Sequence, residues 1–386
     1  MRKPCHLEHS VQVKIPGCPT KSFRFFYRIR IEPLPFLMRP FHRFSSWLRS
    51  RRKSAPRERN LQSLLDGYRA TALLYVAVKL KIADQLTEAR SGEELSRALG
   101  ANPLALQRLL RGLVALGVCS ENSPGVFQMT SMGQRLRSDS DGPEYSLAIL
   151  NGEEYAAAWN DLLHSIKTGD TAFDHVFGES PWQHRQKNPE LNQRFNEWLE
   201  QGAAATGRAL LKVYDFAPHK TVADIGGGQG ALLTTILQAH PSLQGILFDQ
   251  PHVVSGARQP MESAGIASRC QIVPGDFFKA VPPEADAYIL KSILHDWDDK
   301  ACGVILQNCR TVLKPGRPLL VVEKIMPASV IDRPSTVMGD LHMLAVTGGR
   351  ERTADEYRKL FAAAGLELKA VFPLRTGHSL LQVLPV

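Results

Sequence analysis

The spacing of apolar residues predicts a small helical domain that begins near residue 60. Leucine, valine and tyrosine recur mostly three and four positions apart over residues 61–80, which predicts a buried pair of helices. A capping box at Ser91 and Glu94 begins a short helix, and Asn102-Pro103 begins another. Residues 118–129 have the pattern of a hairpin. We therefore expect residues 59–145 to form a winged-helix-like domain.

The helical pattern continues over residues 146–215 and is rich in aromatic residues. Single aromatic side chains of this kind are most often core residues, but some could line a pocket between two domains. The candidates are Tyr155, Trp159, Phe173, Phe177, Trp182, Phe195, Trp198 and Tyr214.

From residue 216 to the end, short apolar runs alternate with helical segments. This alternation predicts a parallel, doubly wound sheet of the α/β class. The last two apolar runs, 366–373 and 379–384, can pair as an antiparallel edge. The five runs expected as parallel strands are 222–225, 245–248, 271–273, 287–290 and 319–322.

Composition places the chain among globular proteins. Hydrophobic residues make up 44% of the 386 positions, and no apolar run reaches the length of a membrane span. The six cysteines form no CxxC pair, so we expect neither a structural zinc site nor a disulfide framework. This cysteine usage fits the cytoplasm, and no metal is expected.

The net charge of +9 is concentrated at the N-terminus. Residues 1–58 carry +11, which leaves the rest of the chain at −2. We expect this basic leader to be disordered or the product of a start codon placed too far upstream. Its arginine content resembles that of an organellar transit peptide, but its prolines would break the required amphipathic helix. A nucleic-acid-binding arm is a weaker alternative.

The winged-helix outline raises a second possibility of nucleic-acid binding. Its second helix could present Gln107, Arg108 and Arg111 to a DNA groove. Only two arginines are available there, and the surrounding body is slightly acidic, so packing or subunit pairing is the favoured interpretation. We expect no nucleic-acid partner.

The strongest chemical signal is a glycine-rich loop after the first expected parallel strand. Gly226 and Gly228 lie in a stretch that runs from Asp224 to Gly230, where glycines allow a ligand to approach the main chain. Asp249 follows the next strand and could accept hydrogen bonds from both hydroxyls of a ribose. Dinucleotide enzymes share these features. Asp224 suits a ligand with an ammonium and a sulfonium better than one with a pyrophosphate, which favours S-adenosyl-L-methionine.

Two further motifs follow later strands. Asp276 could bond an adenine amine, and Phe277 could cover the ring. His295 follows the fourth strand, at the edge where ligands bind in open α/β sheets. Glu323 ends the fifth strand and, with Glu351, could orient His295 as a base.

These motifs together resemble the caffeate and acetylserotonin O-methyltransferase family, which includes bacterial enzymes of secondary metabolism. The resemblance begins near residue 60 and continues to the end. It includes the glycine loop and the motifs FDQP, GDFF, LHDWDD, LKPG and GGRERT, at residues 248–251, 275–278, 294–299, 313–316 and 348–353.

The resemblance implies a class I methyltransferase domain in residues 216–386, behind a winged-helix domain that joins two subunits as a homodimer. It makes His295 the catalytic base and Glu323 and Glu351 its assisting acids. It also places Lys291 and Trp297 with the loop glycines, Asp249, Asp276 and Phe277 at the cofactor. Relatives often have asparagine at the position of His342.

The expected reaction is methyl transfer from S-adenosyl-L-methionine to a phenolic or enolic hydroxyl of a small molecule. We expect His342, Trp159 and Asp296 to contact this acceptor. The alternatives are N- or C-methylation on the same scaffold, a member that has lost methyl transfer, an NAD-dependent oxidoreductase, and a ligand-sensing DNA-binding regulator.

Overall fold

The computed structural model describes residues 61–386. The expectations for the basic leader at residues 1–58 lie outside the described residues. Within the described part, none of the helices is long and apolar enough to cross a membrane.

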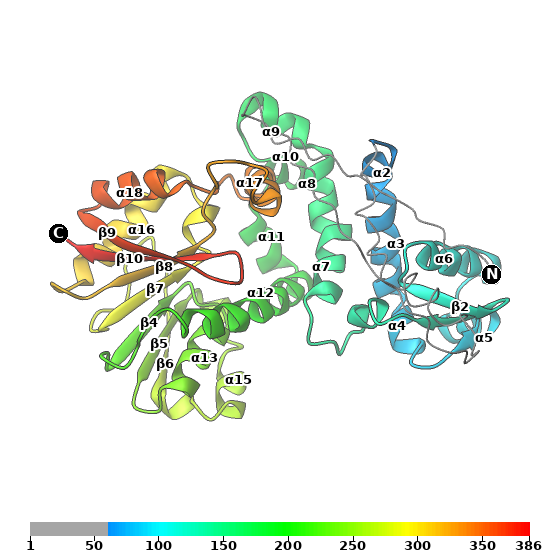
Figure 1. The fold of residues 1–386 in the computed structure, drawn as a ribbon, viewed down its shortest axis with the longest axis horizontal. Coiled ribbons are helices and arrows are strands. Elements are labelled where there is room, and N and C mark those ends of the chain that lie inside the picture. The colour runs from blue at the N-terminus through cyan, green and yellow to red at the C-terminus, as the bar shows by residue number, and fades with distance from the viewer. Residues whose placement is uncertain (1–60) are drawn as a thin grey trace, which may run out of the picture. The chain divides into compact units, whose positions relative to one another are not determined.

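The N-terminal region has the expected helices and hairpin (Figure 1). The Ser91 hydroxyl accepts from the Glu94 N–H, and the Glu94 carboxylate accepts from the Ser91 N–H, so the predicted capping box is confirmed. Three short strands form an antiparallel sheet in the order β1-β3-β2. The elements are α2 (Leu61–Leu65), α3 (Gly67–Lys79), α4 (Ile82–Gln85), β1 (Arg90–Ser91), α5 (Gly92–Leu99), α6 (Pro103–Ala115), β2 (Cys119–Ser123) and β3 (Val126–Met129).

The expectation of a buried helix pair over residues 61–80 is wrong for its first half. Leu61, Leu64, Leu65 and Tyr68 are 73%, 58%, 61% and 67% exposed. The helical pattern was identified correctly. However, apolar spacing does not show whether the apolar face of a helix packs inside its own chain or against another molecule. A patch of this kind on a folded chain is typical of an interaction surface.

The middle region is helical, as expected. A π turn, Asn151–Tyr155, separates α7 from α8 and turns Glu154 and Tyr155 into the interior, where both are buried. Such turns are often found at functional sites. The helices are α7 (Glu144–Leu150), α8 (Ala156–Asn160), α9 (Leu162–Thr168), α10 (Ala172–Phe177), α11 (Pro181–Lys187) and α12 (Pro189–Leu210).

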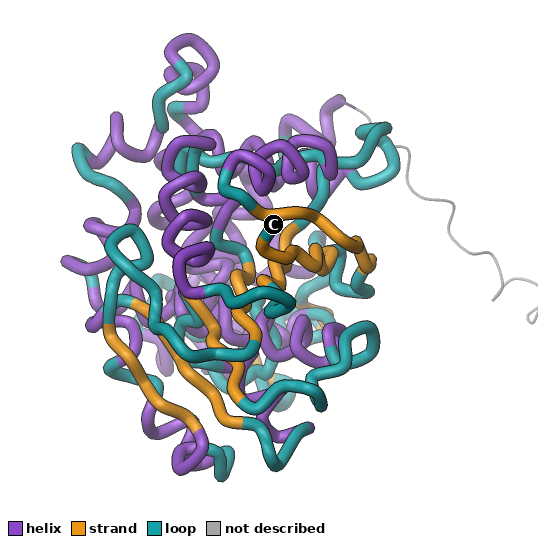
Figure 2. The backbone as a smooth tube through the Cα atoms, turned by 90° about the vertical axis from the view of Figure 1, so that its left-hand side faces the viewer, coloured by secondary structure: helices purple, strands orange, loops and turns teal. Residues whose placement is uncertain are grey.

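A seven-stranded sheet in the order β6-β5-β4-β7-β8-β10-β9 forms the C-terminal region (Figures 1 and 2). The first five strands in this order pair in parallel, and β10 pairs antiparallel with both β8 and β9, so the predicted sheet is confirmed. The strands are β4 (Thr221–Ile225), β5 (Gln244–Asp249), β6 (Cys270–Pro274), β7 (Ala287–Lys291), β8 (Leu319–Glu323), β9 (Leu366–Pro373) and β10 (Ser379–Pro385).

Helices cover both faces of this sheet, which explains why its central strands are almost continuously apolar. On one face, α16 and α18 pack against Ala223, Leu290 and Val321. On the other face, α13 and the end of α12 pack against Val222 and Ile289. The helices of this region are α13 (Ala231–Ala239), α14 (Pro251–Val254), α15 (Arg258–Ser263), α16 (Asp299–Val312), α17 (Pro334–Val346) and α18 (Ala354–Ala363).

The parallel arrangement brings the chemically active segments to one edge. The glycine loop follows β4, Asp249 ends β5, and Glu323 ends β8. After β7 the chain turns sharply at Ser292, whose φ of 55° is in the left-handed region, and forms a 3₁₀ turn that contains His295. Because the carboxyl ends of parallel strands share an edge, these side chains converge there.

Residues 349–352 support this turn from behind. The buried guanidinium of Arg352 donates to the carbonyl oxygens of Leu294 and Trp297, each at 2.8 Å. A Cβ on Gly349 would lie 2.0 Å from the carbonyl oxygen of His295. The absence of a side chain at Gly349 therefore lets the two backbone segments pack against each other.

We predict that Gly349→Ala lowers the free energy of unfolding by about 1 to 3 kcal/mol, because the backbone near His295 must move to admit the methyl group. Gly303→Ala is the matched control, since a Cβ there would have no atom within 4 Å. The control lies within α16 and should leave stability unchanged or raise it by up to about 1 kcal/mol. Urea unfolding measures both, and equal stabilities would contradict the account.

Candidate active site

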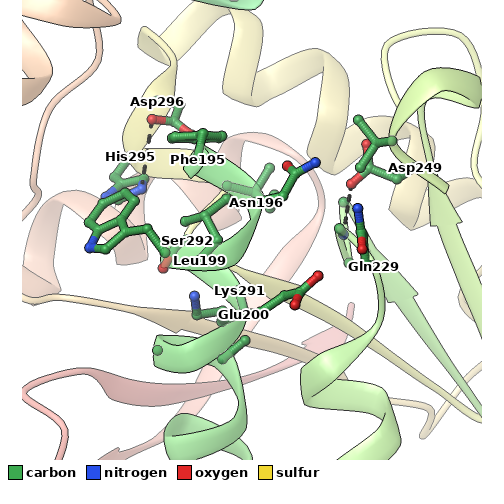
Figure 3. A pocket seen from close by; sticks show the side chains of 18 of the residues that line it. Phe195, Asn196, Leu199, Glu200, Gln229, Asp249, Lys291, Ser292, His295 and Asp296 are labelled. Carbon is green, nitrogen blue, oxygen red and sulfur yellow. Dashed lines mark hydrogen bonds and ion pairs between the residues drawn. The ribbon is translucent and has the colours of Figure 1, made fainter. Parts of the chain in front are cut away.

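One pocket lies at the carboxyl edge of the sheet and extends between helices of the middle region (Figure 3). Figure 3 shows His295 and Asp296 on one side and Asp249 with Gln229 on the other. The predicted residues that line it are Asp224, Gly226, Gly228, Asp249, Phe277, Lys291, His295, Asp296, Trp297 and His342.

The glycine loop and Asp249 form one end of the pocket. The Asp249 carboxylate accepts from the backbone N–H groups of Gly228, at 2.9 Å, and Gln250, at 2.7 Å. Burial raises the pKa of Asp249, and these two hydrogen bonds oppose the rise. Gly228 has a φ of 63°, and a Cβ on it would meet no atom within 4 Å. The loop therefore presents bare backbone to a ligand.

Asp224 lies beneath the loop with an unused hydrogen-bond acceptor. Its Oδ2 is buried and has no partner among residues 61–386. Burial raises the pKa of Asp224 to about 7, assisted by Asp249 and opposed by Lys291. Burial lowers the pKa of Lys291 in turn, although Glu323 and Asp224 counteract it. A buried, unpaired carboxylate oxygen is costly, so this atom is suited to a donor or cation from a ligand.

Aromatic rings form the wall next to the loop. Phe277 and Trp297 meet edge to face with ring centroids 6.2 Å apart. Asp276 does not line the pocket: its Oδ1 accepts from the Phe278 N–H at 2.9 Å, and its side chain is 40% exposed. Its expected contact with adenine stays a prediction.

His295 is held among three carboxylates. Its Nδ1 lies 3.2 Å from Glu351 Oε1 and 3.9 Å from Glu323 Oε2, and its Nε2 lies 3.7 Å from Asp296 Oδ1. Glu323 and Glu351 are 0% and 1% exposed, while His295 keeps 14% of its side-chain surface. Since Glu351 occupies Nδ1, Nε2 is the nitrogen available to a reactant.

The carboxylates control the charge of His295. Burial alone would lower its pKa, but Glu323, Asp296 and Glu351 outweigh burial and raise it to about 9. Burial also raises the pKa of Glu323 to about 7, although the charge of His295 opposes this rise. The raised pKa favours the protonated imidazole, and the ring must be neutral before it can accept a proton.

Glu323 and Glu351 contact different parts of the turn. Glu323 Oε1 accepts from the N–H groups of Ile293 and Leu294, at 2.9 and 2.8 Å, and thus holds the backbone. Of these two acids, only Glu351 is within hydrogen-bond distance of the imidazole. The expected pair of acids is present at His295, with one acid on the ring and the other chiefly on the backbone.

Within residues 61–386, two clusters have the residue types of a metal site. His295, Glu323 and Glu351 each offer a ligand atom, and these atoms lie within 4.8 Å of one another. The same holds for Asp161, His164 and His175, outside the pocket.

The opposite end of the pocket is formed by the middle helices and α17. His342 lines it, whereas Trp159 lies behind and donates its Nε1–H to His342 Nδ1 at 3.1 Å. Arg185 also lines the pocket and forms a buried ion pair with Glu154 at 2.6 Å. Its guanidinium lies 3.7 Å from the centre of the Phe195 ring.

Sequence patterns indicated only part of this end. Of the aromatic candidates, Tyr155, Trp182, Phe195 and Trp198 line the pocket, and Trp159, Phe173, Phe177 and Tyr214 do not. Arg185, Met343 and Ser292 also line it and were not predicted. A charged residue within a run of aromatic residues was the available signal for Arg185. No local signal marked the other two.

Comparison with known proteins identifies the family. Residues 159–367 match the model of an O-methyltransferase domain, and residues 62–139 match that of an O-methyltransferase dimerisation domain. A phenazine O-methyltransferase of Lysobacter antibioticus is 42% identical over 341 residues, which cover 87% of this chain and 99% of that protein. A phenazine-1-carboxylate N-methyltransferase of Pseudomonas aeruginosa is 30% identical, over 82% of this chain and 94% of that protein.

A solved structure with its ligands agrees. The O-methyltransferase of neocarzinostatin biosynthesis, in complex with S-adenosylmethionine and 2-hydroxy-5-methyl naphthoic acid, has a TM-score of 0.73 and 32% identity. The match covers 82% of this chain and 96% of that one. With the sheet, the glycine loop and the buried histidine, these matches show that the chain belongs to the S-adenosylmethionine-dependent O-methyltransferase family of secondary-metabolite enzymes.

Proposed function

We propose that this enzyme methylates a phenolic or enolic hydroxyl of a small aromatic molecule, with His295 as the general base. The observation that carries the proposal is the bond between Glu351 and Nδ1 of His295, which leaves Nε2 as the nitrogen for the acceptor proton. Glu323 and Arg352 hold the turn in place. The direct test is mass spectrometry of hydroxylated aromatic compounds incubated with the enzyme and S-adenosylmethionine.

The residues at the loop end of the pocket fit the cofactor. Asp249 offers a carboxylate to ribose hydroxyls, Gly228 exposes backbone, and Asp224 has a buried oxygen without a partner. Phe277 and Trp297 offer apolar surface to an adenine, beside Lys291. When bound, S-adenosylmethionine supplies an electrophilic methyl group on a sulfonium.

The acceptor end favours an aromatic hydroxyl. Tyr155, Trp182 and Phe195 give it flat apolar walls. The relatives named above include a phenazine O-methyltransferase and an O-methyltransferase in complex with 2-hydroxy-5-methyl naphthoic acid, and both of these compounds are aromatic. A phenol with a pKa of about 10 is within reach of a histidine base, whereas an alcohol is a poorer match. Asp296 and His342 lie where they can contact this acceptor.

We also propose that the enzyme works as a homodimer. The exposed patch of Leu61, Leu64, Leu65 and Tyr68 lies on α2 and α3, and the dimerisation-domain match begins at residue 62. A second copy of the chain would bury this patch.

A nitrogen acceptor is the second candidate, because one relative is an N-methyltransferase. Methylation assays with the phenol and the aniline form of one aromatic scaffold distinguish O-methylation from N-methylation. Methylation of the amine alone would contradict O-methylation as the main activity.

We predict that His295→Ala lowers kcat by about 10² to 10⁴ on a phenol of ordinary acidity, because general-base catalysis is lost. Affinity for S-adenosylmethionine should stay near wild type. His219→Gln is the control, since His219 bonds Tyr214 at 2.8 Å outside the pocket. Full kcat in His295→Ala would overturn the assignment.

The pH dependence gives a second test of this environment. Wild-type activity should rise with pH above the ordinary histidine pKa of 6.5, because the carboxylates raise the pKa of His295 and only its neutral form is a base. Glu351→Gln removes one of these charges, so the rising limb should move to lower pH while maximal kcat falls. If the rising limb of the pH profile stays in place or moves to higher pH in Glu351→Gln, then Glu351 does not raise the pKa of His295.

Asp249→Ala should weaken S-adenosylmethionine binding by about 1.5 to 3 kcal/mol, since hydrogen bonds to a charged acceptor are lost. The exposed Asp355→Ala on α18 is the control. Titration calorimetry measures both, and unchanged affinity in Asp249→Ala would exclude this role.

Leu64→Glu should convert the dimer to monomer, because it places a charge in the apolar patch. Leu104→Glu is the control at another leucine that is 74% exposed. Sedimentation velocity measures the states, and a dimer that persists in Leu64→Glu would count against this surface.

A further inference from the structure

His342 has its tautomer set by a neighbour that can only donate. The indole Nε1–H of Trp159 points to Nδ1 of His342 at 3.1 Å. An indole nitrogen has no lone pair to offer as an acceptor, so Nδ1 must be the acceptor in this contact. The ring proton of a neutral His342 therefore resides on Nε2.

The ring geometry supports this hydrogen bond. The two ring planes are inclined by only 22° and their centroids are 6.3 Å apart. Tyr155 packs nearly perpendicular to His342, with an interplanar angle of 88° and centroids 4.5 Å apart. These two contacts fix the orientation of the imidazole.

The imidazole is also kept neutral. Burial lowers the pKa of His342 to about 4, and the positive charges of Arg185, His295 and Lys324 contribute to the fall. The lowered pKa favours the neutral form of His342, whereas the pKa of His295 in the same pocket is raised.

The free edge of His342 is the one left for a ligand. Among residues 61–386, hydrogen bonding of this ring involves Nδ1 and Trp159, and Nε2 has no such partner. His342 lines the pocket and Trp159 does not. The same helix, α17, also contacts the support of His295, since Asp340 Oδ1 accepts from the Glu351 N–H at 2.8 Å. The helix that carries His342 is thus hydrogen-bonded to Glu351, the residue that bonds His295.

We propose that His342 is a specificity-determining residue that donates from Nε2 and selects acceptors with an oxygen or nitrogen lone pair next to the reacting hydroxyl. The inference rests on the proposed function, because it describes how the same acceptor is recognised. Asparagine could both donate and accept at this position. The imidazole with its proton fixed on Nε2 can only donate there, so it disfavours substrates that place a hydrogen-bond donor opposite Nε2.

Two acceptors of the same shape test this selection. The hydroxyl of 8-hydroxyquinoline adjoins a ring nitrogen, and 1-naphthol has a C–H in its place. We expect wild type to prefer 8-hydroxyquinoline by about 2- to 12-fold in kcat/KM and in affinity, the range of one neutral hydrogen bond. Calorimetry in metal-free buffer with S-adenosylhomocysteine measures the affinities without turnover.

Substitutions identify the source of the preference. His342→Leu should abolish it, His342→Asn should keep part of it through the amide donor, and Trp159→Phe should reduce it by releasing the tautomer. Equal kcat/KM and affinity for the two compounds in wild type, or an unchanged preference in His342→Leu, would overturn the inference. A preserved difference in affinity without methyl transfer would instead overturn the proposed function.

The tautomer can be observed directly. Neutron diffraction from crystals of the deuterated holoenzyme should show deuterium on Nε2 of His342 and none on Nδ1. Deuterium on Nδ1, or on both nitrogens at neutral pH, would overturn the inference even if the variants fail to fold.

Discussion

The site is built around one buried arrangement of charge, an imidazole surrounded by three carboxylates. Burial disfavours every charge in this group. At His295 the attraction of the acids outweighs burial and raises the pKa, whereas at Glu323 burial outweighs the attraction of His295 and also raises the pKa. The result is a histidine with a raised pKa and a fixed orientation. A base with a raised pKa holds an abstracted proton more firmly, at the cost of being largely protonated beforehand.

Much of the surrounding fold maintains this arrangement. Two strand ends deliver His295 and Glu323 to one edge, and the last residues of the GGRERT segment deliver Glu351 and Arg352. Gly349 permits the close approach of the two segments. Asp299, at the start of α16, completes the support by accepting from Arg352 at 2.8 Å. The backbone around His295 is thus held by side chains that do not line the pocket.

The sequence predicted the features that depend on local pattern. Apolar runs and capping residues predicted the sheet and the helices, and glycines and acids at strand ends predicted the residues that line one end of the pocket. The sequence did not predict features that depend on residues far apart in the chain or on a second molecule. The helix at residues 61–65 looked like core because its leucines have core spacing, although in the single chain they are exposed. Trp159 was expected to contact the acceptor, which stays a prediction; in the structure it does not line the pocket and donates to His342, 183 positions away.

The end of the pocket opposite the glycine loop was the least predictable because its residues come from several separate helices. Arg185 pairs with Glu154, which is 31 positions away in the sequence. Glu154 lies in a π turn, and no apolar periodicity indicates such a turn. His342 could be noticed as a departure from a family pattern, but its tautomer is visible only when the Trp159 contact is known.

Whether His295 removes the acceptor proton is tested most directly with a series of phenols of graded acidity. The ratio of wild-type to His295→Ala kcat, measured at one pH, should fall steadily as the phenol becomes more acidic. It should approach one for a phenol that is already ionised, because such an acceptor needs no base. A ratio that stays constant across the series would show that His295 positions the acceptor without taking its proton.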